Sequence, residues 1–210
     1  MSISPPPRKR RKEARPSELA AAALGLFVEK GYAATRLEDV AQRAGVSKGT
    51  LYLYFDSKEA LFKSVIQEGV VPVLVEAENI ALHHEGSTFA LLEKLLANWW
   101  SGIGETAFAG IPKLMVAEAS NFPELAQFYH ENVIRRGKAL LGSALERGVS
   151  SGEFAPMDIA ATIEVVLAPI LMLVIWRYSL AGCQANPVDP KHYLAAHLKL
   201  LRTGLAATRV

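Results

Sequence analysis

The residues with the clearest chemical meaning follow a glycine near the N-terminus. After Gly45, Ser47 can cap a short helix that runs from Lys48 to Phe55. Leu51 and Phe55 share one face of this helix and predict its buried side. The opposite face carries an ammonium group, a hydroxyl, two phenols and a bare backbone, on Lys48, Thr50, Tyr52, Tyr54 and Gly49. Such groups hydrogen-bond phosphates and base edges in the DNA major groove, and glycine lets the backbone approach closely.

A second short helix precedes this one. Apolar residues recur with helical spacing between Leu37 and Ala44, and Gly45 can end the helix in a left-handed conformation. Thr35 and Glu38 have the spacing of a capping box, so we expect Thr35 to cap this helix. Two short helices joined through a glycine are typical of a DNA-binding helix-turn-helix, whose second helix enters the major groove by its N-terminal end.

The flanking sequence predicts the support for this motif. Residues 16–30 have the apolar face of a helix, and Asp56 or Ser57 can start another helix with Lys58 in its first turn. Two short helices cannot bury enough surface alone, so the flanking helices must pack on them. We therefore expect a three-helix DNA-binding domain over residues 16–65.

The stretch GVSKGTLYLYFDSKEALF, preceded by GYAATRLEDVAQRA, resembles the signature of the tetracycline-repressor-like (TetR/AcrR) transcriptional regulators. The resemblance covers about Leu19 to Val65, and the rest of the chain is similar only in length and helical character. It implies DNA contacts from Thr35, Arg36, Ser47, Lys48, Gly49, Thr50, Tyr52, Tyr54 and Lys58. Of these, Thr35, Tyr54 and Lys58 would mainly contact phosphate.

Charge is unevenly distributed along the 210 residues. The net charge is +2, with twelve Lys and Arg against seven Asp and Glu in residues 1–65, and eleven against fourteen in residues 66–210. A basic N-terminal part suits a reader of a polyanion. Residues 1–15 contain three consecutive prolines and a basic run from Arg8 to Lys12, and we expect a disordered arm. This arm is either a solvated tail or a contact to phosphates or the minor groove.

Other features argue against export and a membrane. Cys183 is the single cysteine, so no intrachain disulfide forms, which suits a cytoplasmic protein. No apolar region follows the basic N-terminus, so a secretory signal is not expected. The most apolar run, residues 165–176, is too short to span a bilayer and is expected to be a buried helix.

Catalytic and metal-binding patterns are also missing. The glycines at 102, 104 and 110 follow no strand and precede no Gly-Lys-Ser/Thr, so they do not form a phosphate loop. His83 and His84 are adjacent and would point to different faces of a helix, which does not suit a metal site. We expect no enzymatic activity, no metal and no cofactor.

The remainder, residues 66–210, predicts a larger helical domain and an all-α protein of about nine helices. Residues 57–84 are expected to form one long helix, or two joined at Pro72, that links the two domains. The last two helices, 157–180 and 192–207, have more apolar surface than one exposed face allows. The family resemblance implies that these two helices form a homodimer, which would present two recognition helices to a palindromic operator.

Large apolar side chains in this domain are either an ordinary core or the lining of a ligand cavity. The resemblance implies a pocket for a small apolar inducer. The candidate pocket residues are Trp99, Trp100, Phe108, Met115, Phe122, Phe128, Tyr129, Met172 and Trp176.

Together these observations predict a ligand-responsive repressor that binds double-stranded DNA as a homodimer. The alternative is a helical ligand-binding or interaction module that lacks sequence-specific DNA binding. An α-helical core is common to both hypotheses, and DNA binding distinguishes them.

Overall fold

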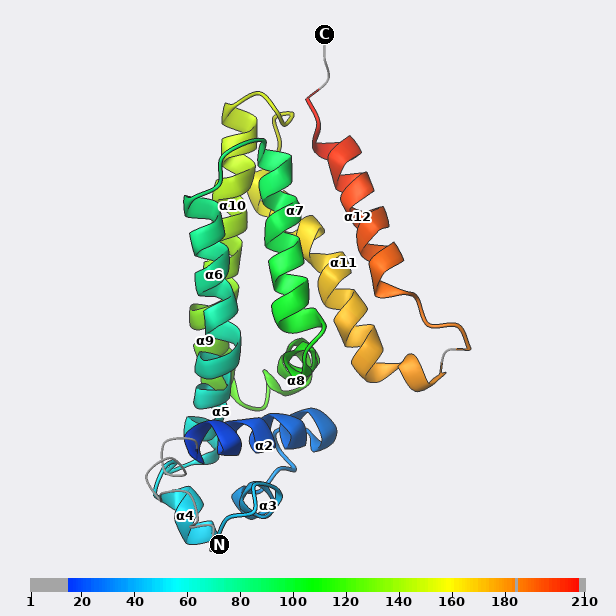
Figure 1. Cartoon of the computed structure of the whole chain (residues 1–210). Coiled ribbons are helices and arrows are strands. Elements are labelled where there is room, and N and C mark those ends of the chain that lie inside the picture. The colour runs from blue at the N-terminus through cyan, green and yellow to red at the C-terminus, as the bar shows by residue number, and fades with distance from the viewer. Residues whose placement is uncertain (1–14, 184, 208–210) are drawn as a thin grey trace, which may run out of the picture.

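The computed structural model describes residues 15–183 and 185–207, and within these ranges the protein is all-α, as predicted (Figure 1). The one pairing of extended backbone in the described ranges is an isolated bridge between Phe154 and Ala206. The helices are α2 (Arg15–Lys30), α3 (Leu37–Arg43), α4 (Lys48–Tyr52), α5 (Lys58–Val65), α6 (Val71–Leu82), α7 (Thr88–Trp99), α8 (Gly110–Glu118), α9 (Pro123–Tyr129), α10 (Arg135–Ser150), α11 (Ile159–Ser179) and α12 (Pro190–Leu205).

Wider π-helical turns join several of these helices without a break. Residues Ile66–Val70 join α5 to α6, His130–Ile134 join α9 to α10, and Trp100–Gly104 extend α7. Residues Ala107–Ala109 form a 3-10 turn that leads into α8. Counted as continuous rods, the described ranges hold nine helices, the number that the sequence predicts.

The small domain consists of α2 to α5 at one end of the molecule (Figure 1). Its core is built around Phe27, Tyr32 and Phe62, whose ring centroids lie 5.3 to 5.9 Å apart in edge and tilted arrangements. Arg15 is the first residue of α2, whereas the sequence places it in the arm. The rest of the predicted arm, residues 1–14, lies outside the described residues.

Polar side chains cap several of the helices. Ser47 accepts a hydrogen bond from the Thr50 amide, and Ser57 accepts one from the Ala60 amide. Ser87, Asp158 and Asp189 cap α7, α11 and α12 in the same way. These bonds satisfy amides that have no partner inside the helix, and they define where each helix starts.

The predicted capping box at Thr35 and Glu38 is wrong. Helix α3 starts at Leu37, and its cap position is Arg36, which makes no side-chain capping bond. Thr35 is buried instead, and its hydroxyl lies 2.7 Å from the carbonyl oxygen of Gly31 and 3.2 Å from that of Leu26. The carbonyl groups at the end of α2 are buried with Thr35 and need donors, so its hydroxyl stabilises the turn rather than the next helix.

The link between the domains is one continuous rod from α5 to α6, as predicted for residues 57–84 (Figure 1). Pro72 lies in the first turn of α6 and has no amide to donate, and the π-helical turn comes immediately before this helix. Gly69 in that turn is covered by the Phe108 ring, since a Cβ there would lie 1.8 Å from a ring carbon. The link is therefore packed against the segment that precedes α8.

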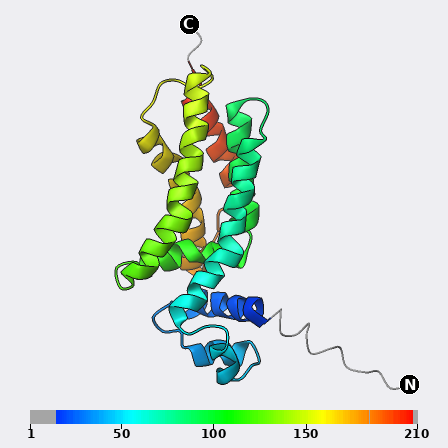
Figure 2. The same ribbon diagram turned by 90° about the vertical axis from the view of Figure 1, so that its left-hand side faces the viewer.

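The larger domain is a helical bundle in which α6, α7, α10 and α11 surround a second apolar core (Figure 2). The predicted helix over residues 123–149 is confirmed as the rod from α9 to α10. Helix α12 lies along α11, and buried His197 on α12 bonds the carbonyl oxygen of Val166 at 3.0 Å. Burial lowers the pKa of His197, so its ring is neutral near pH 7.

The two domains share side chains across their boundary. The first apolar core extends from α2 into Ile111, Met115 and Leu125 of α8 and α9. The rings of Tyr32 and Phe122 meet edge to face at 4.7 Å. The carboxylate of Glu118 also accepts a hydrogen bond of 3.1 Å from the Ala33 amide. The small domain thus packs on α8 and α9 as well as on the link.

Helix α11 differs from its prediction as a buried helix. It has 21 residues and is long and apolar enough to cross a membrane by length and composition alone, but only 17% of its most apolar stretch is buried. The helix continues through Pro169, and one side packs on α8, α10 and α12. Val165, Met172 and Trp176, which recur at helical spacing along α11, remain exposed. This exposed stripe is the largest unpartnered apolar feature of α11.

Candidate DNA-binding surface and ligand cavity

Helix α4 is attached to the core of the small domain by apolar side chains. Leu51 is fully buried and Phe55 nearly so, and both belong to the core of the small domain. Gly45 has φ +65°, which lets the chain turn from α3 into α4. The turn and the anchor leave Ser47, Lys48 and Gly49 exposed at the start of α4. This is the end of the helix that enters the groove in a helix-turn-helix.

Most predicted DNA-contact residues surround this exposed end. Arg36 is exposed at the start of α3, Thr50 is half-buried, and Tyr52 is 43% exposed. Tyr54 is half-buried and packs on the core, so it lies at the edge of the surface. Leu53, which is not among the predicted contacts, is 81% exposed. An exposed leucine beside a recognition helix suits apolar contact with a thymine methyl group.

The ammonium group of Lys48 is already paired. It forms an ion pair with the carboxylate of Glu38 on α3 and lies 5.8 Å from the centroid of the Tyr52 ring. This hydrogen bond and the attraction between the charges lower the pKa of Glu38 and raise that of Lys48, so both groups are charged at neutral pH. The sequence assigned Glu38 to a cap and did not predict this pair.

Thr35 and Lys58 were both predicted to contact phosphate, but Thr35 is buried, and Lys58 is half-buried and bonds the backbone of the protein. Lys58 donates to the carbonyl oxygens of Tyr32, Ala33 and Thr35 at 2.7, 3.2 and 3.0 Å. Its ammonium group also lies 4.4 Å from the centroid of the Tyr32 ring. Burial lowers the pKa of Lys58, and nearby Glu118 opposes that shift. Lys58 therefore holds the turn between α2 and α3, and Thr35, buried in the same turn, has no exposed hydroxyl to offer.

A cavity of about 360 Å³ lies inside the larger domain. Its volume falls in the range of small-molecule sites, and its lining is mostly aliphatic and aromatic. Of the predicted pocket residues, Trp99, Phe108 and Tyr129 line it. The link contributes Val70, Val73 and Leu74 to the same wall. This role of the link was not predicted, because its apolar residues look like ordinary core positions in the sequence.

Few polar groups reach this central cavity. Asn98 donates its amide hydrogen to the carbonyl oxygen of Val73 at 3.0 Å, and Lys138 is paired with Glu164. Tyr129 has no hydrogen-bonding partner among the described residues, and burial raises the pKa of its phenol. The cavity therefore offers one neutral hydroxyl and no unpaired charge from the lining residues. Such a lining suits an apolar molecule with a single polar group.

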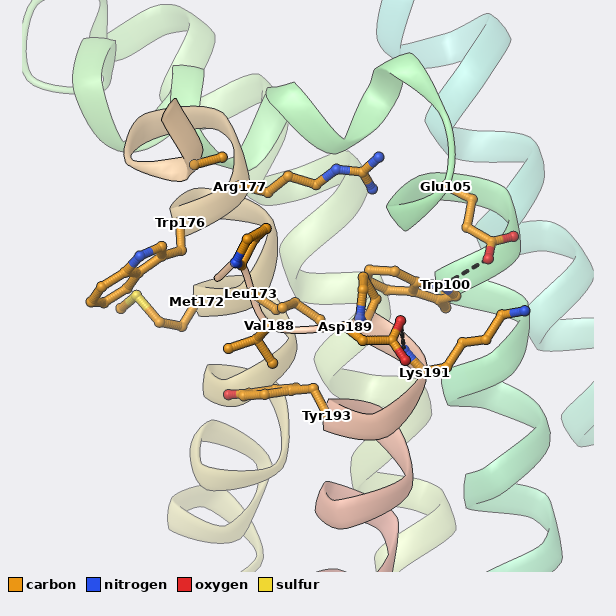
Figure 3. Close-up of a pocket in the computed structure, with 13 residues that line it drawn as sticks. Trp100, Glu105, Met172, Leu173, Trp176, Arg177, Val188, Asp189, Lys191 and Tyr193 are labelled. Atoms are coloured by element: carbon orange, nitrogen blue, oxygen red, sulfur yellow. Dashed lines mark hydrogen bonds between the residues drawn. The ribbon is translucent and has the colours of Figure 1, made fainter. Parts of the chain in front are cut away.

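The other predicted pocket residues lie elsewhere. Met115, Phe122 and Phe128 pack on the core shared by the two domains and line neither cavity. Trp100, Met172 and Trp176 line a separate open groove of about 790 Å³ between α11, α12 and the end of α7. Figure 3 shows Trp100 and Glu105 on one side of this groove, joined by a hydrogen bond of 3.1 Å, and Trp176 and Met172 on the other. The predicted pocket residues are thus divided among the central cavity, the groove and the core, because large apolar side chains occur in all three.

The fold and the exposed face of α4 define a helix-turn-helix DNA-binding protein with an attached helical domain. Residues 19–65 match the family model described as bacterial regulatory proteins, tetR family, and residues 82–180 match that of the tetracyclin repressor-like C-terminal domain. The HTH-type transcriptional regulator YfiR of Bacillus subtilis is 30% identical over 166 residues, which cover 77% of this chain and 78% of that protein. The chain belongs to the TetR family of transcriptional regulators.

Solved structures show the same fold. FadR from Bacillus subtilis in complex with stearoyl-CoA superposes with a TM-score of 0.72 at 24% identity, covering 90% of this chain and 98% of that one. A transcriptional regulator from Saccharomonospora viridis in complex with choline gives a TM-score of 0.73 at 17% identity, covering 92% and 98%. The two ligands named there differ greatly in size and charge.

Replacing Lys58 by Met should destabilise the small domain, because three carbonyl groups lose a charged donor while the aliphatic stem remains. We expect the free energy of unfolding, measured by urea denaturation, to fall by about 1.5–3 kcal/mol. Lys63→Met is the matched control on the same helix, since Lys63 makes a partly exposed pair with Glu59 at 2.6 Å. Its loss should stay below about 1 kcal/mol. Equal losses in the two variants would contradict the assigned role of Lys58.

Proposed function

We propose that this protein is a ligand-responsive repressor that binds a palindromic operator as a homodimer. The observation that carries the proposal is the exposed polar start of α4, held on the buried side chains of Leu51 and Phe55. Membership of the TetR family supports the coarse role in transcription. The DNA contacts, the dimer interface and the ligand site are proposed from the arrangement of this chain's own residues.

Readout of DNA is assigned to the start of α4. Lys48 can donate to O6 or N7 of guanine, and Thr50 can bond a base or touch a thymine methyl group. Arg36, Ser47 and Tyr52 surround these two residues and suit contacts to phosphate. The amide of Gly49 and the phenol of Tyr54 complete the proposed surface. Thr35 and Lys58 support it indirectly by shaping the turn before α3.

The exposed stripe on α11 is the proposed dimer interface. An exposed apolar stripe is costly in a monomer and is stabilised by a second copy. A two-fold dimer uses the same patch on both subunits, and it would give two α4 helices related by the symmetry of a palindrome. Helix α12 lies along α11 and would extend the interface.

The central cavity is the proposed ligand site, and the link is the proposed moving part. Val70, Val73 and Leu74 belong to the rod that continues into α5 of the DNA-binding domain. A ligand that occupies the cavity only in one position of this rod shifts the equilibrium toward that position. DNA and ligand are then reciprocally coupled, and the ligand weakens DNA binding by the same factor as DNA weakens ligand binding. The charge balance of the lining favours a small, neutral, mostly apolar ligand.

DNA binding is tested by selecting duplexes from a random pool with the purified protein. We expect enrichment of a palindromic sequence and a gel shift that weakens steeply with salt. Lys48→Ala or Thr50→Ala should change the preferred base at one position in each half-site, at a cost of roughly 1–3 kcal/mol. Lys94→Ala, on α7 of the other domain, is the control and should leave the preference unchanged. Failure to enrich any sequence would favour a helical module without sequence-specific DNA binding.

The dimer is tested by sedimentation equilibrium of variants that place a charge on the stripe. Met172→Lys should weaken the association by about 2 kcal/mol or more, since it would bury an unpaired ammonium group. Val116→Lys is the matched control, because Val116 is also an exposed apolar residue, at 72% against 49% for Met172, but lies on α8. A wild-type protein that sediments as a monomer, or a control that dissociates as readily, would disprove this interface.

The cavity is tested with the neutral fluorescent probe N-phenyl-1-naphthylamine. We expect one saturable site per chain and a reciprocal loss of affinity for the selected DNA. Leu74→Trp fills the cavity from the link and should lower the affinity for the probe at least about tenfold. Leu82→Trp is the control on the same helix, where the side chain is 78% exposed. Unchanged probe binding in Leu74→Trp would place the site elsewhere. Mass spectrometry of the natively purified protein would then identify the natural ligand.

A further inference from the structure

The folded DNA-binding domain has little net charge with which to attract DNA. Residues 15–65 contain seven Lys and Arg and six Asp and Glu, a net charge of +1. Residues 1–14 contribute five basic residues and one acidic residue. Affinity for DNA of any sequence depends on how many cations can reach phosphates. In a nearly neutral domain, the placement of individual ion pairs therefore decides which cations are free to do so.

The carboxylates of this domain are placed against its cations. Glu29 accepts two hydrogen bonds from Arg43 at 2.8 and 2.7 Å, and Asp39 lies 3.4 Å from Lys30. Both of these pairs join α2 to α3. The pair of Lys48 with Glu38 differs, since it places a carboxylate directly beside the first residue of α4.

The geometry of this third pair restricts a flexible side chain. Lysine has four rotatable bonds and loses about 2 kcal/mol of rotamer entropy when it is fixed. Here the ammonium group is held between the carboxylate of Glu38 and the ring of Tyr52. Both partners of the pair are more than half exposed, at 59% and 51%, so the pair lies on the surface proposed to face DNA.

We propose that Glu38 determines specificity by positioning the ammonium group of Lys48 for base readout and withholding it from the phosphates of unrelated DNA. The proposal rests on the DNA-binding function proposed above. Glu38 would not itself read a base. It acts through Lys48, as a positioning residue for the contact.

Two physical effects give this role to a carboxylate. An ammonium group has three donors, so Lys48 can keep one bond to Glu38 while it donates another to guanine. Released from Glu38, the same side chain would turn to the nearest phosphate, which every DNA sequence provides. A phosphate bound beside Lys48 would also lie within a Debye length of the charge of Glu38, which would repel it. Both effects weaken binding to unrelated DNA more than binding to a site that offers guanine.

The test compares two duplexes of equal length: one selected from a random pool by the wild-type protein, the other its shuffled sequence. Glu38→Gln should strengthen binding to the shuffled duplex more than to the selected one. The ratio of the two affinities should fall about twofold to fivefold, the range for exposed ion pairs. The salt slope for the shuffled duplex should steepen by about 0.9, the value for one added phosphate contact.

Asp39→Asn is the matched control. It makes the same change in net charge on the neighbouring residue, but its partner is Lys30 on α2. It should change both affinities by a similar factor and leave their ratio intact. If Glu38→Gln behaves like Asp39→Asn, the effect is one of net charge and the proposal is overturned.

A double-mutant cycle shows whether Glu38 acts through Lys48. In a Lys48→Ala background, Glu38→Gln should no longer change the ratio of affinities. If the ratio still falls, Glu38 acts on DNA directly and the positioning role is disproved. The wild-type protein separates this outcome from failure of the proposed function. If the wild-type protein selects no sequence, the DNA-binding proposal itself has failed. If it selects a sequence and Glu38→Gln leaves the ratio of affinities unchanged, only the proposed role of Glu38 has failed.

Discussion

The arrangement of the DNA-binding domain depends on satisfying the backbone of the turn between α2 and α3. This turn must place two short helices that cannot bury enough surface to stand alone. The ring of Tyr32 in this turn packs on those of Phe62 and Phe122, and carbonyl groups that are buried without donors are costly. The ammonium group of Lys58 and the hydroxyl of Thr35 supply those donors. The position of α4 thus depends on the hydrogen bonds that Lys58 and Thr35 make in the turn between α2 and α3.

The same turn is where the two domains meet. Glu118, at the end of α8, accepts a hydrogen bond from the amide of Ala33, and the first turn of α8 contains Ile111 and Pro112, which line the central cavity. The link approaches the turn from the other side, with cavity-lining residues at one end and Lys58 at the other. Two rigid elements therefore run from the cavity to one loop of the DNA-binding domain. In the proposed function, a change in cavity occupancy would reach the recognition surface through α8 and through the link.

Periodic and local features of this chain were readable from its sequence, and pairings between distant residues were not. Ser47, Gly45, Leu51 and Phe55 behave as predicted, because caps, turns and buried faces depend on neighbours a few residues away. Lys58 was assigned to phosphate because a lysine beside a recognition helix looks solvated until the turn folds onto it. Met115 and Trp176 were both predicted to line the ligand pocket, but Met115 packs in the core and Trp176 lies on the exposed stripe. A large apolar side chain has one sequence signature whether it ends in a core, a cavity or an exposed stripe.

The ion pair of Lys48 adds an electrostatic consequence to this architecture. The folded domain is nearly neutral, and the basic run from Arg8 to Lys12 carries five of the twelve Lys and Arg of residues 1–65. Attraction to any DNA and discrimination among DNA sequences are then assigned to different parts of the chain. Charge in the N-terminal segment can raise the rate of encounter without regard to sequence. The ion pair of Lys48 with Glu38 on the folded surface would lower the affinity for unrelated DNA sequences. A regulator that must find one operator among many competing sites benefits from this separation, because specificity depends on the difference between two affinities and not on either one alone.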